Sequence, residues 1–515
     1  MLGMNNRKYI LIIILTGLTA YLTSFQNSFV WDDIGLITIN PYIKSWKHIG
    51  DIFTSFLYHK TGDGGTFYRP IVSLSFLMDY SIWKENPVGY HLTNLILHIT
   101  NAILLYKIIL NLFKEEKLGL FTALIFLVHP IHTEAVTYIS GRADPIVTLF
   151  MLSSLLLFIA YAPQNRFWGV LCAIAFYTLA LLTKAYAIVF VLLLLAYGFC
   201  FKPKIRLRHY LIFFAISLSY GLVRLTLLKN EIGMSHLFMV ISRSFTEYLR
   251  LLLFPINLHY QRELHIPSSI FCPYGILSIL MLLAFILFVI IFRKKKPVLF
   301  GSIWFIIALI PYQNTLRLNA TVAEHWLYFP SIGFSLAISG LLFAKGKKGV
   351  AYIFLVFIVI SGIVLTNFQS LHWKDEITLY NHILRFRPNE PRVHNNLGNA
   401  YATKGEYNKA IEHFKKAVET APNYSTAYFN MGAVYLEKQH FYTAAAQFQK
   451  ALALNPSYTK ARLYLAETYN RLGLTYYNQK NYPKAGELWI KALKIYPGYS
   501  KSRMNIERLR HPEKK

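Results

Sequence analysis

Long apolar runs alternate with short polar loops over the first 367 residues of the chain. Eleven of these runs are close to the ~17–25 residues that a helix needs to cross a bilayer. They cover residues 9–25, 92–113, 118–139, 145–161, 167–183, 185–201, 209–228, 271–292, 298–313, 326–343 and 350–367. The pattern predicts an all-α, polytopic membrane domain over residues 1–367, with about eleven transmembrane helices and a large polar loop at 26–91.

A further stretch, residues 234–258, is apolar but carries charges inside it. Arg243, Glu247 and Arg250 recur there at helical spacing. Charged side chains are expensive inside a bilayer, so this stretch is predicted to be an interfacial or re-entrant helix that borders a cavity. It is not counted as a twelfth span, and the topology of the whole chain depends on that choice.

Basic residues gather in the short loops between the apolar runs. The chain has 53 Lys+Arg against 25 Asp+Glu, a net charge of +28. The basic runs at 201–208, 293–296 and 345–348 fall on one side if the N-terminus is cytoplasmic, as the positive-inside rule predicts. Eleven crossings then place the C-terminus outside. Membrane lipids account for these loops, and no nucleic-acid partner is expected.

The last 140 or so residues are polar and contain a repeat of 34 residues. Small residues, aromatic residues and a final proline recur in register, at Gly398, Tyr401, Ala410, Phe414 and Pro422, and again at Gly432, Tyr435, Ala444, Phe448 and Pro456. This is the tetratricopeptide pattern of an α-solenoid, whose concave groove binds an extended peptide or another protein.

The repeats are predicted at 391–424, 425–458 and 459–499. In the third, the pattern runs seven residues late, and two extra turns in its first helix would absorb the shift. Residues 368–390 form a connector with a half-repeat, and 501–515 form a basic tail.

Two adjacent carboxylates, Asp32 and Asp33, follow the first apolar run at the membrane surface. They repel each other and lose hydration, so cations, a metal or a substrate hydroxyl should compensate them. Mixed carboxylates, Arg and His at one membrane face suit a substrate with an anionic phosphate and a reacting hydroxyl. The other candidates that return to this face are Arg69, His129, His132, Glu134, Arg142, Asp144, Lys184, Arg317, Glu324, His325 and Tyr328.

Each candidate also has a structural interpretation. The acidic pair could cap a loop helix or hold a divalent metal ion, the one cofactor that the pattern leaves open. Arg69 could form a surface ion pair, and Arg142 could pair with Asp144. Three candidates could instead stabilise local structure: His129, His132 and Glu134. Three others stand at helix ends, where a long polar side chain can snorkel toward the membrane surface: Lys184, Glu324 and His325.

Several short motifs, taken in order, resemble the transmembrane and tetratricopeptide-repeat O-mannosyltransferases, which belong to the GT-C glycosyltransferases. They are FVWDD at 29–33, YRP at 68–70, YHLTN at 90–94, HPIHTEAV at 129–136, GRA at 141–143 and LYFPS at 327–331. The resemblance covers nearly the whole chain. It implies a sugar donor on a polyprenyl phosphate, with mannose the first choice, and an acidic motif in the first outer loop that carries the chemistry.

The resemblance also suggests roles for the site residues. A carboxylate of the acidic pair, Asp33 by a small preference over Asp32, would act as the general base in a single, inverting displacement. The other candidates would bind the donor phosphate or the substrates. Two positions depart from the family pattern, His325 after Glu324 and Ala185 after Lys184, and both concern the grip on the donor phosphate.

We therefore predict a membrane glycosyltransferase that acts on a hydroxyl of a protein or glycan at the extracytoplasmic face. The short tail fits a bacterial member in the inner membrane, with its repeat domain outside. One alternative is a non-catalytic, membrane-anchored tetratricopeptide scaffold for envelope proteins. Another, a transporter of lipid-linked sugars, fits less well because the polar groups crowd one face.

Overall fold

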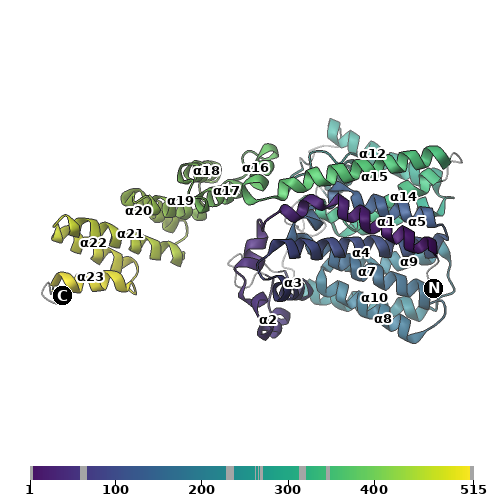
Figure 1. Ribbon diagram of the computed structural model, residues 1–515, viewed down its shortest axis with the longest axis horizontal. Helices are drawn as coiled ribbons and strands as arrows, with labels where there is room; N and C mark the ends of the chain where they lie inside the picture. Colours follow the sequence, from purple (N-terminus) through teal and green to yellow (C-terminus); the bar gives the residue numbers. More distant parts are fainter. Residues whose placement is uncertain are drawn as a thin grey trace. The chain divides into compact units, whose positions relative to one another are not determined.

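The structure, a computed structural model, describes residues 4–57, 67–227, 237–260, 262–264, 266, 271–312, 321–343 and 348–510. These residues contain helices and loops and no strand, and the chain divides into two compact units, Met1–Asp375 and Glu376–Lys515. Figure 1 shows the helices of both units. The predicted fold class, all-α with apolar helices followed by a tetratricopeptide solenoid, is confirmed.

The first unit, called the membrane unit below, holds fifteen α-helices among its described residues. They are α1 (Met4–Ala20), α2 (Ile49–Thr54), α3 (Pro70–Trp83), α4 (Pro87–Phe113), α5 (Glu116–Val128), α6 (Thr133–Val136), α7 (Ala143–Tyr161), α8 (Phe167–Thr183), α9 (Phe190–Phe201), α10 (Leu207–Leu227), α11 (Leu237–Leu253), α12 (Pro273–Phe292), α13 (Lys296–Leu309), α14 (Pro330–Phe343) and α15 (Lys348–Ser370).

Short 3-10 or π turns connect many of these helices. They are η1 (Leu22–Gln26), η2 (Ile34–Thr38), η3 (Pro41–Lys44), η4 (Trp46–His48), η5 (Pro130–His132), η6 (Ile139–Arg142), η7 (Ala185–Val189), η9 (Ile310–Tyr312), η10 (Glu324–Leu327) and η11 (Leu371–Trp373).

Every one of the eleven apolar runs contains a helix, but their number as membrane spans stays a prediction. By length and composition, four described helical segments qualify as spans: Pro87–Phe113, Ile139–Tyr161, Pro273–Phe292 and Ala351–Trp373. A bent pair, Glu116–Val128 with Pro130–Val136, would add a fifth, and five further apolar helices are shorter. Likewise α11 is a helix, as expected, while its position relative to the bilayer is not tested.

The run at 118–139 is not the continuous helix that its hydropathy suggested. Helix α5 ends at Val128, and the helical segment after it is bent by 52°. Pro130 has no N–H and disfavours helical geometry at the residue before it, so His129 is extended, with ψ 122°. The bend directs the following turn, which carries Glu134, into the polar interior of the unit.

Two hydrophobic cores hold the membrane unit together. The larger one joins residues from most of the apolar helices, and the pairs α13 with α14 and α7 with α8 pack extensively. A smaller core lies within the predicted polar loop, where Leu36 and Ile37 of η2 and Phe76 of α3 pack with Ile139 and Ala143 at the start of α7. The first loop is therefore folded onto the η6–α7 turn.

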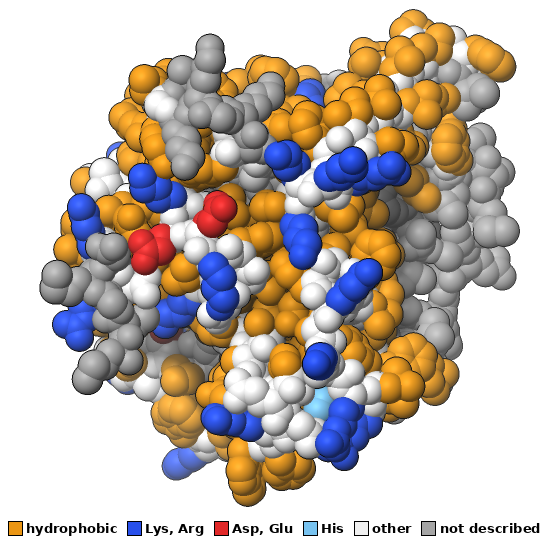
Figure 2. Space-filling view, turned by 90° about the vertical axis from the view of Figure 1, so that its right-hand side faces the viewer, with side chains coloured by type: hydrophobic (Ala, Val, Ile, Leu, Met, Phe, Trp, Pro, Cys, Tyr) orange, Lys and Arg blue, Asp and Glu red, His pale blue; other side chains and the backbone are white. Residues whose placement is uncertain are grey.

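The basic loops described here meet at one end of the membrane unit. Lys117 lies over the ring of Tyr352 at 4.6 Å and Lys296 over that of Phe201 at 5.9 Å, and Phe201 also contacts Phe113. Figure 2 shows Lys and Arg side chains spread over this end, with few acidic ones. This grouping fits the predicted sorting of positive charge. The run at 345–348 lies almost entirely outside the described residues.

The second unit, called the repeat unit below, consists of stacked helix pairs. Its helices are α16 (Glu376–Phe386), α17 (Pro391–Thr403), α18 (Tyr407–Thr420), α19 (Ser425–Glu437), α20 (Phe441–Leu454), α21 (Thr459–Asn478), α22 (Tyr482–Ile495) and α23 (Ser500–Arg510). Helix α21 has 20 residues where α17 and α19 have 13, a difference of seven. The predicted lengthening of the third repeat's first helix is thus confirmed.

Candidate functional site

The acidic pair stands in a tightly folded loop after α1. Trp31 has φ +53°, a left-handed conformation that is unfavourable for a bulky side chain, and a helical turn follows at once. The carboxylate of Asp33 reaches back and accepts the Val30 N–H at 3.0 Å. It also accepts the Ser140 N–H at 2.8 Å and the Ser140 hydroxyl. Asp33 is fully buried, so these bonds tie the first loop to η6.

Burial dominates the electrostatics of Asp33. Loss of hydration raises its pKa from 3.8 to about 7, with a smaller upward push from the charge of Asp32. The bonds from Ser140 and Val30 favour the ionised form and offset part of that rise.

Asp32 has a different environment from its neighbour. Its side chain is half-buried, in contrast to the fully enclosed side chain of Asp33. Its backbone N–H donates to the Tyr138 hydroxyl at 3.2 Å. Of the two carboxylates, Asp32 is the more accessible to a substrate.

The turn that holds Asp33 continues into a set of buried ion pairs. Arg142 is fully buried, and its guanidinium donates to Asp79 at 2.6 Å and to the Tyr90 carbonyl at 3.3 Å. Both carboxylate oxygens of Asp144 accept from Nζ of Lys184 at 2.8 Å. The alternative that Arg142 pairs with Asp144 is wrong, because residues two apart on a helix point to different sides.

A second cation lies near Lys184. Burial lowers the pKa of Lys184, Asp144 opposes this, and the nearby charge of Arg69 lowers it further. The Arg69 guanidinium lies over the Phe67 ring at 4.7 Å. No described residue forms an ion pair with Arg69, so the surface ion pair that its sequence position allowed is not seen within the described ranges. Arg69 and Lys184 are called the basic pair below.

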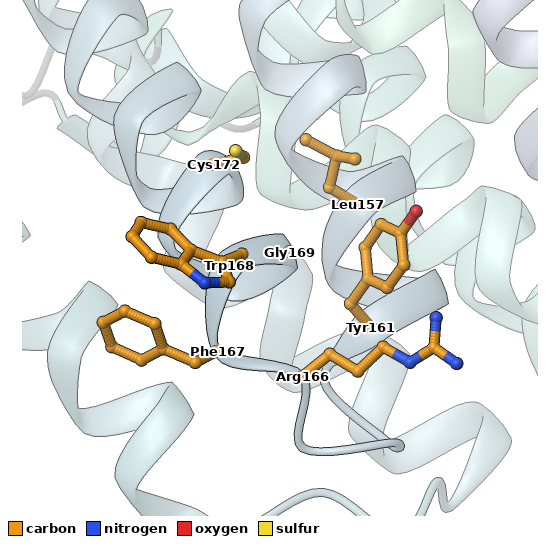
Figure 3. A pocket seen from close by; sticks show the side chains of 7 residues that line it. All are labelled: Leu157, Tyr161, Arg166, Phe167, Trp168, Gly169 and Cys172. Atoms are coloured by element: carbon orange, nitrogen blue, oxygen red, sulfur yellow. The ribbon is translucent and has the colours of Figure 1, made fainter.

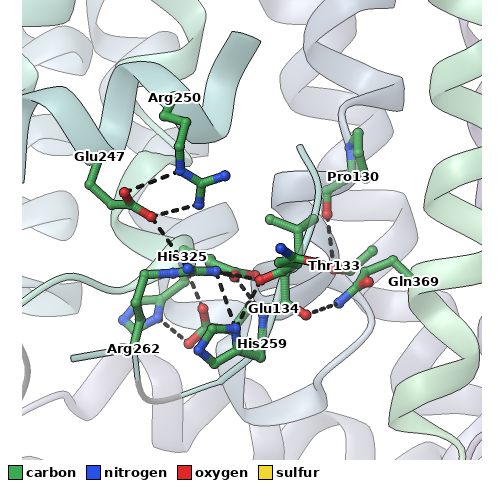
Figure 4. A network of polar contacts seen from close by, with 12 residues as sticks. Pro130, Thr133, Glu134, Glu247, Arg250, His259, Arg262, His325 and Gln369 are labelled. Carbon is green, nitrogen blue, oxygen red and sulfur yellow. Dashed lines mark hydrogen bonds and ion pairs between the residues drawn. The ribbon is translucent and has the colours of Figure 1, made fainter. Parts of the chain in front are cut away.

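A network of buried charges forms the adjoining part of the interior (Figure 4). Glu134 accepts from Nδ1 of His325 at 2.6 Å and from its backbone N–H at 3.0 Å. Glu324 accepts from the His259 N–H at 2.7 Å and from Arg262 at 3.0 Å. The structure thus brings together three of the predicted residues, Glu134, Glu324 and His325, and adds His259 and Arg262 from another segment.

Three arginines surround one acid of this network. Glu247 of α11 contacts Arg250 at 2.6 Å, Arg262 at 3.3 Å and Arg243 at 3.6 Å. Burial raises the pKa of Glu324 to about 8, against the opposing effect of Arg262. The charge on α11 is therefore compensated within the unit and does not face an apolar surface alone.

Three other predicted residues serve the core. His129 accepts the Ile131 N–H at 3.2 Å through Nδ1, and its Nε2 lies 3.0 Å from the Leu252 carbonyl. His132 is fully buried, 3.2 Å from the Ser331 hydroxyl. The hydroxyl of Tyr328, also fully buried, contacts His98 at 2.7 Å and Asn101 at 3.1 Å.

The prediction for Arg317 falls outside the described residues. In the described part of the chain, no group of three or more His, Cys, Asp or Glu side chains is placed to hold a metal ion. Metal binding by Asp32 and Asp33 stays a prediction.

Sequence reasoning missed several partners that build the site: Ser140, Tyr138, Asp79, His259 and Arg262. Ser140 stands directly before the GRA motif, and Asp79 is an acid inside an apolar run, so each had a signal. Residues 257–264 carry no periodicity, so nothing in that segment indicated that Arg262 and His259 would bind Glu324.

A cavity of about 580 Å³ opens elsewhere, at the turn between α7 and α8 (Figure 3). It is lined by Leu157, Tyr161, Arg166, Phe167, Trp168, Gly169 and Cys172. None of these residues was predicted for the site. Since Lys184 follows the opposite end of α8, this cavity is not part of the cluster of carboxylates and cations.

Residues 74–226 match the family described as dolichyl-phosphate-mannose-protein mannosyltransferase. Tetratricopeptide families match residues 398–439, 425–458 and 466–499. The first match contains the Glu134, Arg142, Asp144 and Lys184 positions, whereas the acidic pair and Arg69 precede it.

The chain also resembles several known proteins over much of its length. The chain is 25% identical over 441 residues to protein O-mannosyl-transferase F38B6.6 of Caenorhabditis elegans, covering 80% of this chain and 62% of that protein. It is 24% identical over 478 residues to human protein O-mannosyl-transferase TMTC3, covering 80% and 51%. Against human TMTC1 it is 37% identical over 151 residues, covering 28% and 16%. The chain thus spans about half to three-fifths of the length of the first two.

The fold and these matches define a protein with apolar helices long enough to cross a membrane, a region similar to a mannosyltransferase family, and tetratricopeptide repeats. More narrowly, the chain joins a domain of the dolichyl-phosphate-mannose-protein mannosyltransferase family to such repeats, and its homologues are protein O-mannosyl-transferases of the TMTC group. The resemblance found in the short motifs is confirmed.

Proposed function

We propose that this chain transfers a mannosyl group from a polyprenyl-phosphate donor to a hydroxyl of a protein, at the extracytoplasmic face of the membrane. One observation carries the proposal. The turn from Ser140 to Asp144 holds the acidic loop at one end, through Asp33, and the basic pair at the other, through Lys184. The two ends of this turn are four residues apart in sequence, which supports placing the acid and the phosphate-binding pair beside one sugar phosphate.

The reaction is a single displacement at the anomeric carbon. The acceptor oxygen forms a bond to C1 of the sugar, and the bond between C1 and the phosphate oxygen breaks. Polyprenyl phosphate leaves with the electron pair, and the proton of the acceptor hydroxyl passes to a carboxylate. Attack opposite the leaving group inverts the anomeric configuration.

We assign the base role to Asp32 and a bracing role to Asp33. A general base must come within hydrogen-bond reach of the proton that it takes. The half-buried Asp32 meets that condition better than Asp33, which is fully buried and already accepts three hydrogen bonds. The preference for Asp33 drawn from the motif alone is thereby replaced in this proposal. The pKa of about 7 would suit Asp33 as a base, but its enclosure weighs more.

The basic pair would hold the donor phosphate. A planar guanidinium can donate two parallel hydrogen bonds to phosphate oxygens, and Arg69 has no ion-pair partner in the described ranges. Lys184 is kept in place by Asp144 and contributes charge beside it. The positive charge of the basic pair would stabilise the negative charge that develops on the leaving phosphate.

The orientation of the chain follows from its charged loops. Asn6, at the start of α1, bonds to Tyr106 near the basic end of the unit, and the acidic loop follows the other end of α1. Sorting of basic loops to the cytoplasm puts the acidic loop outside. A bacterial inner membrane is the proposed setting, because residues 368–515 contain no Cys, and the repeats would present the acceptor protein.

The test uses purified full-length protein with a polyprenyl-phosphate mannose donor and a protein acceptor. Asp32→Asn should lower kcat by about 10²–10⁴-fold, the range for loss of a general base, while the donor KM changes little. Asp33→Asn should leave more activity, because its carboxylate braces the loop. Arg69→Lys should raise the donor KM, since it removes the bidentate geometry. Full activity in both aspartate variants would refute the acid–base assignment.

The alternative of a non-catalytic scaffold predicts a different outcome of these measurements. A non-catalytic scaffold would show no transfer in the wild-type chain and would lose its function with residues 391–499 and not with the acidic pair.

A further inference from the structure

The five residues that lead out of the membrane unit, 370–374, are bonded to the segment that precedes the acidic pair. Ser28 donates its backbone N–H and its hydroxyl to the Lys374 carbonyl, each at 2.9 Å. Asn27, itself buried, donates its side-chain amide to the Ser370 carbonyl at 3.0 Å. This exit segment therefore contacts the chain before the acidic pair at both of its ends, Ser370 and Lys374.

An aromatic stack links the same exit segment to Asp32. Trp373 is 4% exposed and lies nearly parallel to Tyr138, with ring centroids 5.0 Å apart and an interplanar angle of 18°. The Tyr138 hydroxyl accepts the Asp32 N–H at 3.2 Å. One ring thus stands between Trp373 and the backbone of the proposed base.

A third segment joins this stack from the network around Glu324. Tyr260 contacts Trp373 with centroids 6.1 Å apart and Trp31 with centroids 5.1 Å apart. Trp31 has the left-handed backbone conformation, which persists only where surrounding packing enforces it. Trp373 lies where the segments that shape the acidic loop meet.

We propose that Trp373 is a positioning residue for Asp32, in an exit segment that Ser370 and Lys374 tie to the acidic loop. The inference rests on the proposed function, because it takes Asp32 as the base. Trp373 acts through Tyr138, whose ring it fixes and whose hydroxyl holds the Asp32 backbone. Because the membrane unit ends at Asp375, this positioning residue stands two residues before the point at which the repeats are attached in sequence.

The experiment compares Trp373→Ala, Trp373→Phe and Tyr138→Phe in the full-length protein. The control is Leu371→Ala, in the same 3-10 turn but 38% exposed. Two readouts are taken: amide hydrogen exchange of residues 27–34, and kcat and KM with polyprenyl-phosphate mannose. Trp373→Ala should speed exchange about tenfold or more and lower kcat by about 10–10²-fold with the donor KM nearly unchanged.

The conservative variant separates positioning from general destabilisation. Trp373→Phe keeps an aromatic ring on Tyr138, so kcat and exchange should return close to wild-type values. Leu371→Ala should match wild type in both readouts. Unchanged exchange and kcat in Trp373→Ala, or an equal loss in the Leu371→Ala control, would overturn the proposal.

Tyr138→Phe decides the matter if Trp373→Ala does not fold. It removes one hydroxyl and keeps the ring, so the Asp32 amide should exchange faster and kcat should fall. No change in either quantity overturns the proposal. If the wild-type chain transfers no sugar, the proposed function fails, whereas the exchange measurements still test whether the exit segment holds the acidic loop.

Discussion

At the scale of single residues, burial separates two side chains that the sequence makes look alike. Asp33 is enclosed by bonds from Val30 and Ser140, whereas Asp32 keeps an accessible carboxylate. Two neighbouring carboxylates can differ in this way because one of them, Asp33, exchanges its bound water for hydrogen bonds from the protein. The division suggests one carboxylate for chemistry and one for structure.

The raised pKa of Asp33 predicts a dependence of stability on pH. Because its folded pKa is about 7 and its ordinary value 3.8, the folded protein binds a proton that the unfolded chain has lost between these values. The stabilisation is full below about pH 4 and is lost as pH rises through about 7. The shift of roughly three units corresponds to about 4 kcal/mol.

This dependence can be measured as the difference between wild type and Asp33→Asn in thermal unfolding in detergent. The difference in unfolding free energy should change across pH 4–7, since asparagine does not titrate. Asp51→Asn, at a carboxylate that is half exposed, is the control and should leave the wild-type profile intact. A wild-type profile retained in Asp33→Asn would contradict the assigned shift.

At the scale of elements, glycines permit a close helix crossing in the membrane unit. A Cβ at Gly301 would lie 2.5 Å from the Gly333 carbonyl oxygen and 2.7 Å from the Ala337 N. These are backbone atoms, so no side-chain rotation could relieve the contact. The close approach of α13 and α14 matters for the site because η10, with Glu324 and His325, leads into α14.

Gly301→Ala should therefore lower the stability of the membrane unit, by roughly 1–3 kcal/mol as in other overpacked cores. The matched control is Gly349→Ala in α15, where a Cβ would meet nothing within 4 Å. That change should be neutral or slightly stabilising, because alanine favours helix. Thermal unfolding in detergent gives both values, and equal effects would argue against the close crossing.

At the scale of the whole molecule, the chain consists of two compact units with different kinds of core. The repeat unit packs small residues against rings, and a Cβ at Gly432 would lie 2.9–3.2 Å from the Phe448 ring. The membrane unit instead holds buried ion pairs among apolar helices. Because the cores are separate, damage to one should leave the other folded.

Gly432→Val tests this independence. It should lower the unfolding transition of the repeat unit by roughly 1–3 kcal/mol while the transition of the membrane unit stays where it is. Gly486→Val, at a helical position with nothing within 4 Å, is the control. Calorimetry resolves the two transitions, and a shift of both would show that the units are coupled.

The sequence by itself determined the helical class, the repeats with their lengthened third member, and the resemblance to the O-mannosyltransferases. Hydropathy and a fixed repeat period are local signals that survive without knowledge of the fold. It also directed attention to Asp32, Asp33, Arg69 and Lys184.

Only the tertiary structure decided which candidates lie together and which partner each one has. It paired Arg142 with Asp79 and Asp144 with Lys184, sent His129, His132 and Tyr328 into the core, and bent the third apolar run at Pro130. The physical reason is that burial and the choice of partner depend on segments far apart in the chain. No local pattern indicates that Ser140 would donate hydrogen bonds to Asp33, or that Trp373 would stack on Tyr138.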